Sequence, residues 1–244
     1  MKIDKLILLN WGVLNDGEFI FDRITSITGE TGVGKSSIGD AIQTIMGAAL
    51  ESIITYNAGQ DESHQGKKKN RERRSHAGYV AGEDQFIFAR PNGCTGTISL
   101  SFKPSPGEDA EPFTAILNTT VEMEEKKDGK TPKVSDYRFF IIKNTDLALT
   151  DFVGSAQEVL DHRGLNRIFK IKYRDSELIE YPGKEGFLMG LYGHLWGKAT
   201  ADKRSAYKAA KAFCNFINAK PVEDINSFIR NDFLNQKDMR LQIE

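Results

Sequence analysis

The chain has few cysteines and no long apolar run. It contains only two cysteines, Cys94 and Cys214, which lie far apart and without a C-x-x-C spacing. This argues against a disulfide framework and against a zinc cluster. The apolar run near the start, from Leu6 to Leu9, is shorter than the core of a signal peptide and far shorter than a membrane span. We therefore expect a cytoplasmic protein that has no contact with a membrane.

The sequence also has no excess of charge of one sign. Lysine and arginine total 33 against 34 aspartate and glutamate residues, so the formal net charge is −1. The whole molecule is therefore not drawn toward nucleic acid, although a local basic patch could still attract it. With 244 residues, the chain can bury a real core in one large domain or two small ones, which excludes a peptide or a bare linker.

The pattern of the first fifty residues predicts a hairpin, a short strand and a helix. Residues 2–9 and 18–22 are strand-like, and Asn-Asp-Gly at 15–17 is typical of a hairpin connection. The β-branched segment 24–28 predicts a short buried strand that runs into a glycine-rich loop. A helix with one apolar face follows, because apolar residues recur with helical spacing. They are Ile38, Ala41, Ile42, Ile45, Met46 and Ala49.

Beyond this segment the pattern changes from polar to strand-like and then to helical. Residues 57–76 are polar and basic, which predicts a loop. Alternation over 78–142 predicts antiparallel strands separated by the acid-rich stretches 104–112 and 124–133. Residues 201–218 carry an apolar stripe and predict a helix. The stripe is formed by Ala206, Tyr207, Ala210, Phe213, Cys214 and Ile217.

These patterns predict two parts in the chain. The first, residues 1–150, contains the glycine-rich loop, an antiparallel β-layer and a basic loop at 57–76. Residues 151–244 form a helical part that leads toward a coiled coil.

One motif carries recognisable chemistry. The octapeptide Gly29-Glu30-Thr31-Gly32-Val33-Gly34-Lys35-Ser36 satisfies G-x-x-x-x-G-K-[ST] at every fixed position. Its backbone N–H groups would cradle phosphates, Lys35 would reach the β- and γ-phosphates, and Ser36 would ligate Mg²⁺. Ser37, which follows, is assigned to the same cofactor-binding set. The alternative, a purely structural glycine turn, is disfavoured because the motif opens an amphipathic helix.

The segment SITGETGVGKSSIGDAIQTIMG at 26–47 resembles the N-terminal head segment of the structural-maintenance-of-chromosomes (SMC) class of ABC-type ATPases. Thr31 stands where that class usually has Asn, but Asp40-Ala41-Ile42 is kept. The GETG tetrapeptide is also similar to the DNA-repair ATPase RecN. The stretch from YNAGQD to RPNG and the segment INSFIRNDFL at 225–234 resemble the MukB-like JetC subunits of Wadjet plasmid-defence systems.

The resemblance implies an α/β P-loop fold: a mixed sheet with the phosphate loop, an antiparallel β-layer and C-terminal helices. It also implies that residues 1–150 are a P-loop ATPase lobe, with ATP and Mg²⁺ as cofactors. Arg73 or Arg74 would contact nucleotide or DNA, although the basic run Lys67 to Arg74 can also be a solvated loop. Gln236 would join Mg²⁺ to the γ-phosphate, or it is an exposed polar residue. Trp11 would lie near the adenine, or it is a core aromatic of the hairpin.

Two catalytic motifs of such enzymes are missing from the sequence. RFFIIKNTD at 138–146 is the nearest match to a Walker B strand and lacks its Asp-Glu ending, and no SGG signature occurs. The resemblance implies that both lie in a C-terminal lobe beyond a coiled coil. We therefore identify no catalytic residue here and expect the chain alone to hold half of a site and to be inactive.

In the intact protein, the resemblance implies a homodimer of heads with kleisin-type and nuclease subunits, acting on duplex DNA in plasmid defence. Three alternatives stay open. The first is a RecN-like repair ATPase, and the second is a nucleotide-binding regulatory or DNA-binding module without turnover. The third, a P-loop GTPase or kinase, ranks low because the sequence has no N-K-x-D and no clear second carboxylate motif.

Overall fold

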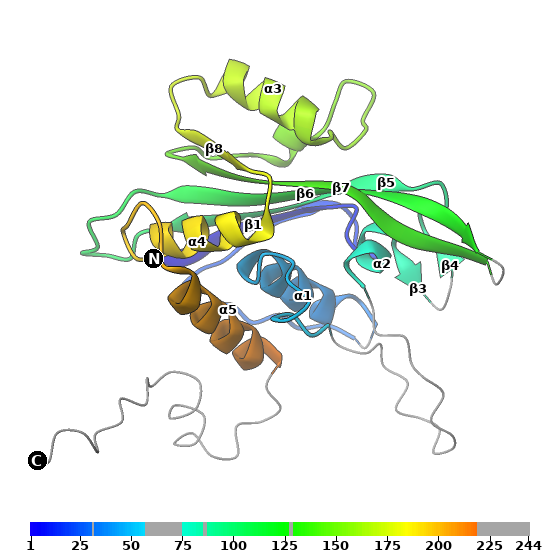
Figure 1. Ribbon diagram of the computed structural model, residues 1–244, viewed down its shortest axis with the longest axis horizontal. Coiled ribbons are helices and arrows are strands. Elements are labelled where there is room, and N and C mark those ends of the chain that lie inside the picture. Colours follow the sequence, from blue (N-terminus) through cyan, green and yellow to red (C-terminus); the bar gives the residue numbers. More distant parts are fainter. Residues whose placement is uncertain (31, 57–74, 85–86, 127–128, 219–244) are drawn as a thin grey trace, which may run out of the picture.

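The computed structural model describes the chain except for residues 31, 57–74, 85–86, 127–128 and 219–244. A six-stranded sheet forms its centre (Figure 1). The helices α1, α2, α4 and α5 lie on one face of this sheet, and α3 lies on the other. The helices are α1 (Lys35–Met46), α2 (His76–Ala81), the 3-10 helix η1 (Leu149–Phe152), α3 (His162–Lys172), α4 (Lys184–Leu195) and α5 (Lys203–Asn218).

The sheet is antiparallel throughout, with the strand order β2-β1-β5-β6-β7-β8. The α/β class and the antiparallel strands are confirmed, but the mixed sheet with a separate antiparallel layer, which the resemblance implied, is wrong for the described residues. Strand β1 pairs with β5 along most of its length, which joins the first hairpin to the later strands in one layer. The strands are β1 (Lys2–Leu9), β2 (Gly17–Ile20), β5 (Cys94–Lys103), β6 (Phe113–Lys126), β7 (Gly129–Lys143) and β8 (Leu178–Tyr181), and β3 (Glu83–Asp84) with β4 (Ile87–Phe88) forms a separate ribbon.

Alternating side chains of β1 build a core on each face of the sheet, because successive residues of a strand point to opposite sides. Leu6 and Leu8 are buried in the cluster that contains the apolar residues of α1. Ile7 and Leu9 are buried in the second cluster, with Phe169 of α3. The sheet therefore separates the phosphate-loop helix from α3.

The predicted helix after the glycine-rich loop is confirmed as α1, and its predicted apolar face is buried. The helix ends at Met46, before Ala49. Ala48 and Ala49 have left-handed backbone conformations, with φ of 52° and 49°. An α-helix cannot continue through positive φ, so the chain turns there.

The predicted strands around TISLSF and YRFFII are confirmed as β5 and β7, but two boundaries are wrong. Residues 78–81, at the start of the predicted strand region, belong instead to α2 (His76–Ala81). The acid-rich stretch 124–133 was expected to separate strands, yet its described residues extend β6 and β7. These residues pair in the β6–β7 ladder, and an exposed ion pair joins the two strands, with Lys133 Nζ 2.5 Å from Glu124 Oε1. Opposite charges can stabilise a cross-strand pair that buries little surface.

The prediction of a short buried strand at 24–28 is wrong in both structure and burial. This segment has no strand assignment and is exposed along its length, with Ile24 86% and Ile27 44% exposed. A segment this short becomes a strand only when a neighbouring strand offers hydrogen bonds. Within the described chain, β2 ends at Ile20 and pairs with β1, and no strand pairs with 24–28.

Among the described residues after 150, the helical part contains the α-helices α3, α4 and α5 and one unexpected strand, β8. The predicted stripe of 201–218 faces inward on α5, with Ala206, Ala210 and Cys214 fully buried. Strand β8 pairs with β7 of the first part, and residues of α4 and α5 share the core of α1. The division of the chain at residue 150 stays a prediction.

Candidate functional site

The phosphate loop connects the exposed segment 24–28 to the N-terminus of α1. Gly32 and Gly34 have φ of 89° and 93°, a backbone conformation that side chains with a Cβ rarely adopt. Gly34 is the N-cap of α1 and makes no side-chain cap hydrogen bond, and the first turn of the helix contains no acidic residue. The first N–H groups of α1 and the positive end of its dipole therefore form a site suited to an anion.

Lys35 begins α1 and turns its side chain back into the loop. Its Nζ donates to the carbonyl oxygens of Gly29 at 2.7 Å and of Glu30 at 2.6 Å. The ammonium group is thus held inside the curve of the backbone, where a phosphate would meet both the lysine charge and the backbone N–H groups. Ser36 is exposed next to it, and Ser37 is buried.

The connection between β1 and β2 supports the loop from behind. A Cβ built on Gly34 would lie 2.3 Å from Leu14 Cδ2, so the side chain of Leu14 occupies the space beside this glycine. Gly12, in the same connection, donates its N–H to the carbonyl of Tyr79 at 2.7 Å. Gly34 is therefore required both for its positive φ and for the close approach of Leu14.

Trp11 is a core residue. Of its two predicted roles, the core aromatic agrees with the structure, and the position near the adenine does not. Its side chain is 1% exposed, which leaves no face on which a base could stack. The indole Nε1 donates to the carbonyl of Ser37 at 2.8 Å, in the first turn of α1. The ring stacks on Tyr79 with 4.6 Å between centroids and 5° between planes. Trp11 therefore positions the phosphate-loop helix and does not face nucleotide.

A buried polar network continues from Trp11 through α1. The Tyr79 hydroxyl donates to Asp40 Oδ2, and Gln43 Nε2 donates to Asp40 Oδ1 at 2.5 Å. Asp40 and Gln43 are both fully buried. Because buried polar groups need their partners, this network fixes the rotation of α1 about its axis. Asp40 lies on the side of α1 opposite Ile38 and Ile45, so the apolar spacing of the helix did not predict its burial, and its partner Tyr79 carried no signal either.

Arg90 holds the connection between β1 and β2 in place, and sequence reasoning missed it. Its Nε donates to Asn10 Oδ1 at 2.9 Å, and its Nη1 and Nη2 donate to the Gly12 carbonyl at 3.1 and 3.2 Å. Burial lowers the pKa of the Arg90 guanidinium from its ordinary value. Asn10 itself has a φ of 51°. Since Arg90 lies about eighty positions along the chain from Asn10, no local spacing could have revealed the contact.

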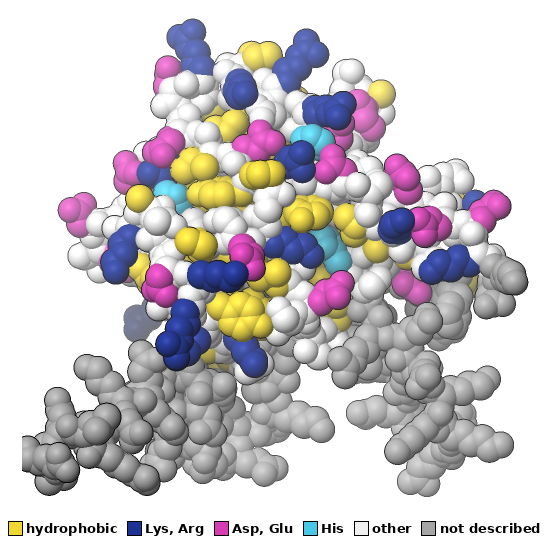
Figure 2. All heavy atoms as spheres, viewed as in Figure 1, with side chains coloured by type: hydrophobic (Ala, Val, Ile, Leu, Met, Phe, Trp, Pro, Cys, Tyr) yellow, Lys and Arg dark blue, Asp and Glu magenta, His cyan; other side chains and the backbone are white. Residues whose placement is uncertain are grey.

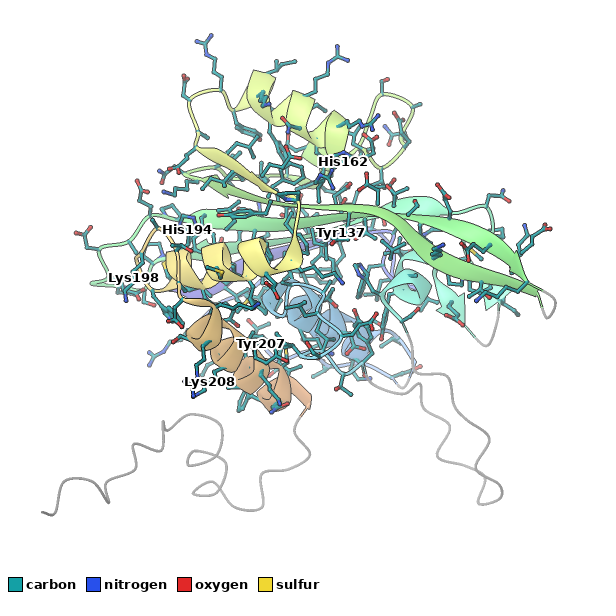
Figure 3. All side chains as sticks on the ribbon, viewed as in Figure 1. Tyr137, His162, His194, Lys198, Tyr207 and Lys208 are labelled. Atoms are coloured by element: carbon teal, nitrogen blue, oxygen red, sulfur yellow. The ribbon has the colours of Figure 1, made fainter. Side chains whose placement is uncertain are left out.

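A separate cavity of about 810 Å³ lies between the end of α1, the start of α2, β7 and α4, and none of its lining residues belongs to the phosphate loop. Lys184 lines it, donates to the carbonyl of Ala49 at 2.6 Å and lies 5.5 Å from the ring centroid of Tyr137. Figure 3 shows Tyr137 on β7 beside the start of α4. His76 also lines this cavity, and burial lowers the pKa of His76 to about 3.

Several predicted site residues lie outside the part of the chain that the structure describes. They are Thr31 of the phosphate loop, Arg73 and Arg74 of the basic loop, and Gln236 near the C-terminus. The structure brings together Gly29, Glu30 and Lys35 through the lysine contacts. The cofactor-binding roles assigned to these residues stay predictions.

Comparison with known proteins agrees with the phosphate loop. Residues 3–62 match the family described as the P-loop containing region of AAA domain, a segment that runs from β1 past α1. No curated protein matches the chain. Among the described residues, no helix is long and apolar enough to cross a membrane. The motif, its geometry and the family match together define a P-loop nucleotide-binding region, which supports a P-loop nucleoside triphosphatase.

Proposed function

We propose that this chain is the ATP-binding half of an SMC-like head. The observation that carries the proposal is the phosphate loop at the uncapped N-terminus of α1, with the Lys35 ammonium held by the carbonyls of Gly29 and Glu30. Phosphate oxygens would replace these carbonyls as partners of Lys35 and would accept hydrogen bonds from the first N–H groups of α1.

The residues present also fit a magnesium ion bound together with the nucleotide. The exposed hydroxyl of Ser36 lies one residue after Lys35, at the position from which this motif supplies a Mg²⁺ ligand. Gln236 is the second ligand that we propose. When bound, Mg²⁺ neutralises charge on the β- and γ-phosphate oxygens. Ser36 would orient the ion, while Lys35 would hold the phosphates themselves.

We infer that a second lobe completes the head. Segment 24–28 leads directly into the phosphate loop, and its isoleucines Ile24 and Ile27 are exposed. Extended apolar residues are stabilised when a neighbouring strand pairs with them and covers them. A C-terminal lobe that adds such a strand would also bring the Walker B carboxylates next to Ser36, because hydrolysis needs a carboxylate on Mg²⁺ and a group that positions water.

The wider role rests on the sequence resemblance. Two such heads would enclose two ATP molecules, and hydrolysis would drive translocation along duplex DNA or its loop extrusion, with kleisin-type and nuclease subunits in plasmid defence. Arg73 or Arg74 would contact nucleotide or DNA in that assembly. A RecN-like repair ATPase shares the same loop, and a regulatory module would bind nucleotide without turnover.

Nucleotide binding tests the phosphate loop directly. We expect Lys35→Ala to weaken binding of a fluorescent ATP analogue by at least about tenfold, which is about 1.4 kcal/mol. Lys211→Ala, which removes an exposed lysine of α5, should leave the affinity unchanged. Equal affinities for wild type and Lys35→Ala would refute the assignment of this loop to phosphate.

Turnover tests the half-site. Steady-state ATPase activity of residues 1–244 should be close to background, because transition-state contacts are absent without the second lobe. Co-expression with a C-terminal lobe should restore turnover that depends on Lys35. Lysine-dependent turnover of about 1 s⁻¹ by the chain alone would overturn the half-site. If the added lobe restores no activity, the regulatory module becomes the better description.

A further inference from the structure

Helix α3 lies on the face of the sheet away from the phosphate loop (Figure 1). Its inner side is apolar and buried: Leu165 is 0% and Phe169 1% exposed. The ring of Phe169 meets those of Phe140 and Phe152 at centroid distances of 6.3 and 6.0 Å, both edge-on. The apolar face of this helix is therefore already occupied by the protein's own core.

The outer side of α3 carries a basic stripe, which we define as Arg163, Arg167, Lys170 and Arg174. The first three are exposed on the helix, and Arg174 follows its C-terminal end with 81% of its side chain exposed. Spacings of four and three residues place Arg163, Arg167 and Lys170 along one side of α3, and Arg174 lies just past Lys172, the last residue of the helix. Figure 2 shows lysine and arginine side chains projecting from the top of the molecule, where α3 lies.

Few acidic groups neutralise this stripe. Within the described chain, Arg163, Arg167 and Lys170 take part in no ion pair, and Arg174 meets only Asp175, at 3.8 Å. Like charges three or four residues apart on a helix repel one another. A polyanion that binds along the stripe would relieve this repulsion while it satisfies several cations at once, so the helix gains from such a partner.

The residues around the stripe indicate which kind of binding partner fits it: a membrane, a protein or nucleic acid. A basic amphipathic helix binds a membrane by burying its apolar face in the lipid, but the apolar face of α3 is packed on the sheet. A protein partner would need an apolar centre for its interface, and Ile171, 70% exposed, is the one large exposed apolar side chain of α3. A row of separate cations without an apolar patch matches the phosphates of nucleic acid, which are contacted by charge without reading sequence.

We propose that the basic stripe of α3 is a docking surface for the phosphate backbone of duplex DNA. This surface lies across the sheet from the nucleotide site and is distinct from the basic run Lys67 to Arg74. This proposal rests on the proposed function, because it names the surface at which that function would bind DNA. The residues of the stripe lie outside the phosphate loop. Loss of DNA binding at α3 would therefore leave the affinity for nucleotide unchanged, and the two proposals can fail separately.

The chain offers a matched control for testing this surface. Arg163 and Lys170 stand seven residues apart on α3, and Arg204 and Lys211 stand seven residues apart on α5, all four exposed. Helix α5, which carries Tyr207 and Lys208, lies on the other side of the sheet (Figure 3). The double variants Arg163→Gln/Lys170→Gln and Arg204→Gln/Lys211→Gln change the net charge equally, so they separate the position of the charge from its amount.

Binding of a short fluorescent DNA duplex of mixed sequence would be measured by anisotropy between about 50 and 200 mM salt. We expect the α3 double variant to weaken binding at least about fivefold and to reduce the slope of log K against log salt by up to about 2, because each lost phosphate contact removes about 0.9. The α5 double variant should bind within about twofold of wild type. Arg163→Lys/Arg167→Lys should also retain binding, since backbone contact requires charge and not guanidinium geometry.

Three results would overturn the proposal. If the two double variants weaken DNA binding equally, the affinity depends on net charge and not on the position of the stripe. An unchanged affinity in the α3 variant would assign the stripe to solvent. Sedimentation with anionic phosphatidylserine vesicles that depends on the stripe, without an effect on DNA binding, would assign it to a membrane surface instead. Circular dichroism of each variant would show that α3 remains folded.

Discussion

Replacing Trp11 by phenylalanine tests the support behind the phosphate loop. Trp11 is 1% exposed, donates from Nε1 to the carbonyl of Ser37 at 2.8 Å and stacks on Tyr79. Phenylalanine keeps a ring against Tyr79 but removes the N–H donor and part of the buried volume. The substitution therefore removes the hydrogen bond between the hairpin and the first turn of α1 together with some packing.

The expected loss of stability has two parts of similar size. The smaller ring leaves a space of about 40 Å³, which costs about 1 kcal/mol at about 24 cal/mol per Å³. The lost hydrogen bond costs about another 1 kcal/mol. We therefore expect Trp11→Phe to lower the free energy of unfolding by about 2 kcal/mol, and the melting temperature by about 4 to 8 °C for a chain of this size.

The chain supplies its own control because it has two tryptophans. Trp196 is 43% exposed and makes a tilted contact with the ring of Tyr192 at 5.7 Å, so Trp196→Phe should cost less than about 0.5 kcal/mol. Urea denaturation followed by far-ultraviolet circular dichroism would compare the two variants. If Trp11→Phe destabilises the protein no more than Trp196→Phe does, the hydrogen bond to Ser37 does not hold α1 in place.

Two further predictions concern the loop and a buried histidine. Gly34→Ala should weaken nucleotide binding more than Gly32→Ala, because both glycines have φ near 90° but only a Cβ at Gly34 would meet Leu14. Titration with a fluorescent ATP analogue would measure the two affinities. Adding Leu14→Ala to Gly34→Ala should restore part of the binding, and failure to do so would contradict the steric reason. Burial lowers the pKa of His76 from 6.5 to about 3, so below pH 6.5 the unfolded chain takes up a proton that the folded chain refuses. The free energy of unfolding should therefore fall by about 2 kcal/mol between pH 7 and pH 5. Urea denaturation at the two pH values would measure this loss, and His76→Gln should abolish it. An equal loss in the variant would assign the pH dependence to other groups.

The local parts of the site could be predicted from sequence because they depend on neighbours along the chain. The glycines of the phosphate loop, Lys35 and the helix after them form one continuous segment, and the apolar spacing of that helix requires no distant contact. The supporting contacts could not be predicted in this way. Leu14 meets Gly34, and Arg90 holds Gly12, but these residue types have no preference that would reveal a partner elsewhere in the chain.

By itself, the sequence determined the phosphate loop, the helix α1, the alternating strands β5 and β7, and the apolar stripe of α5. These elements follow from periods of 3.6 and 2 residues and from glycine at positions of positive φ. The tertiary structure decided how segments with weaker patterns behave. The described residues of stretch 124–133 extend β6 and β7 because strand pairing satisfies their backbone N–H and C=O groups, and an exposed ion pair crosses the two strands. Segment 24–28 looked equally strand-like but stays unpaired and exposed, since a strand requires a partner and the described chain supplies none there.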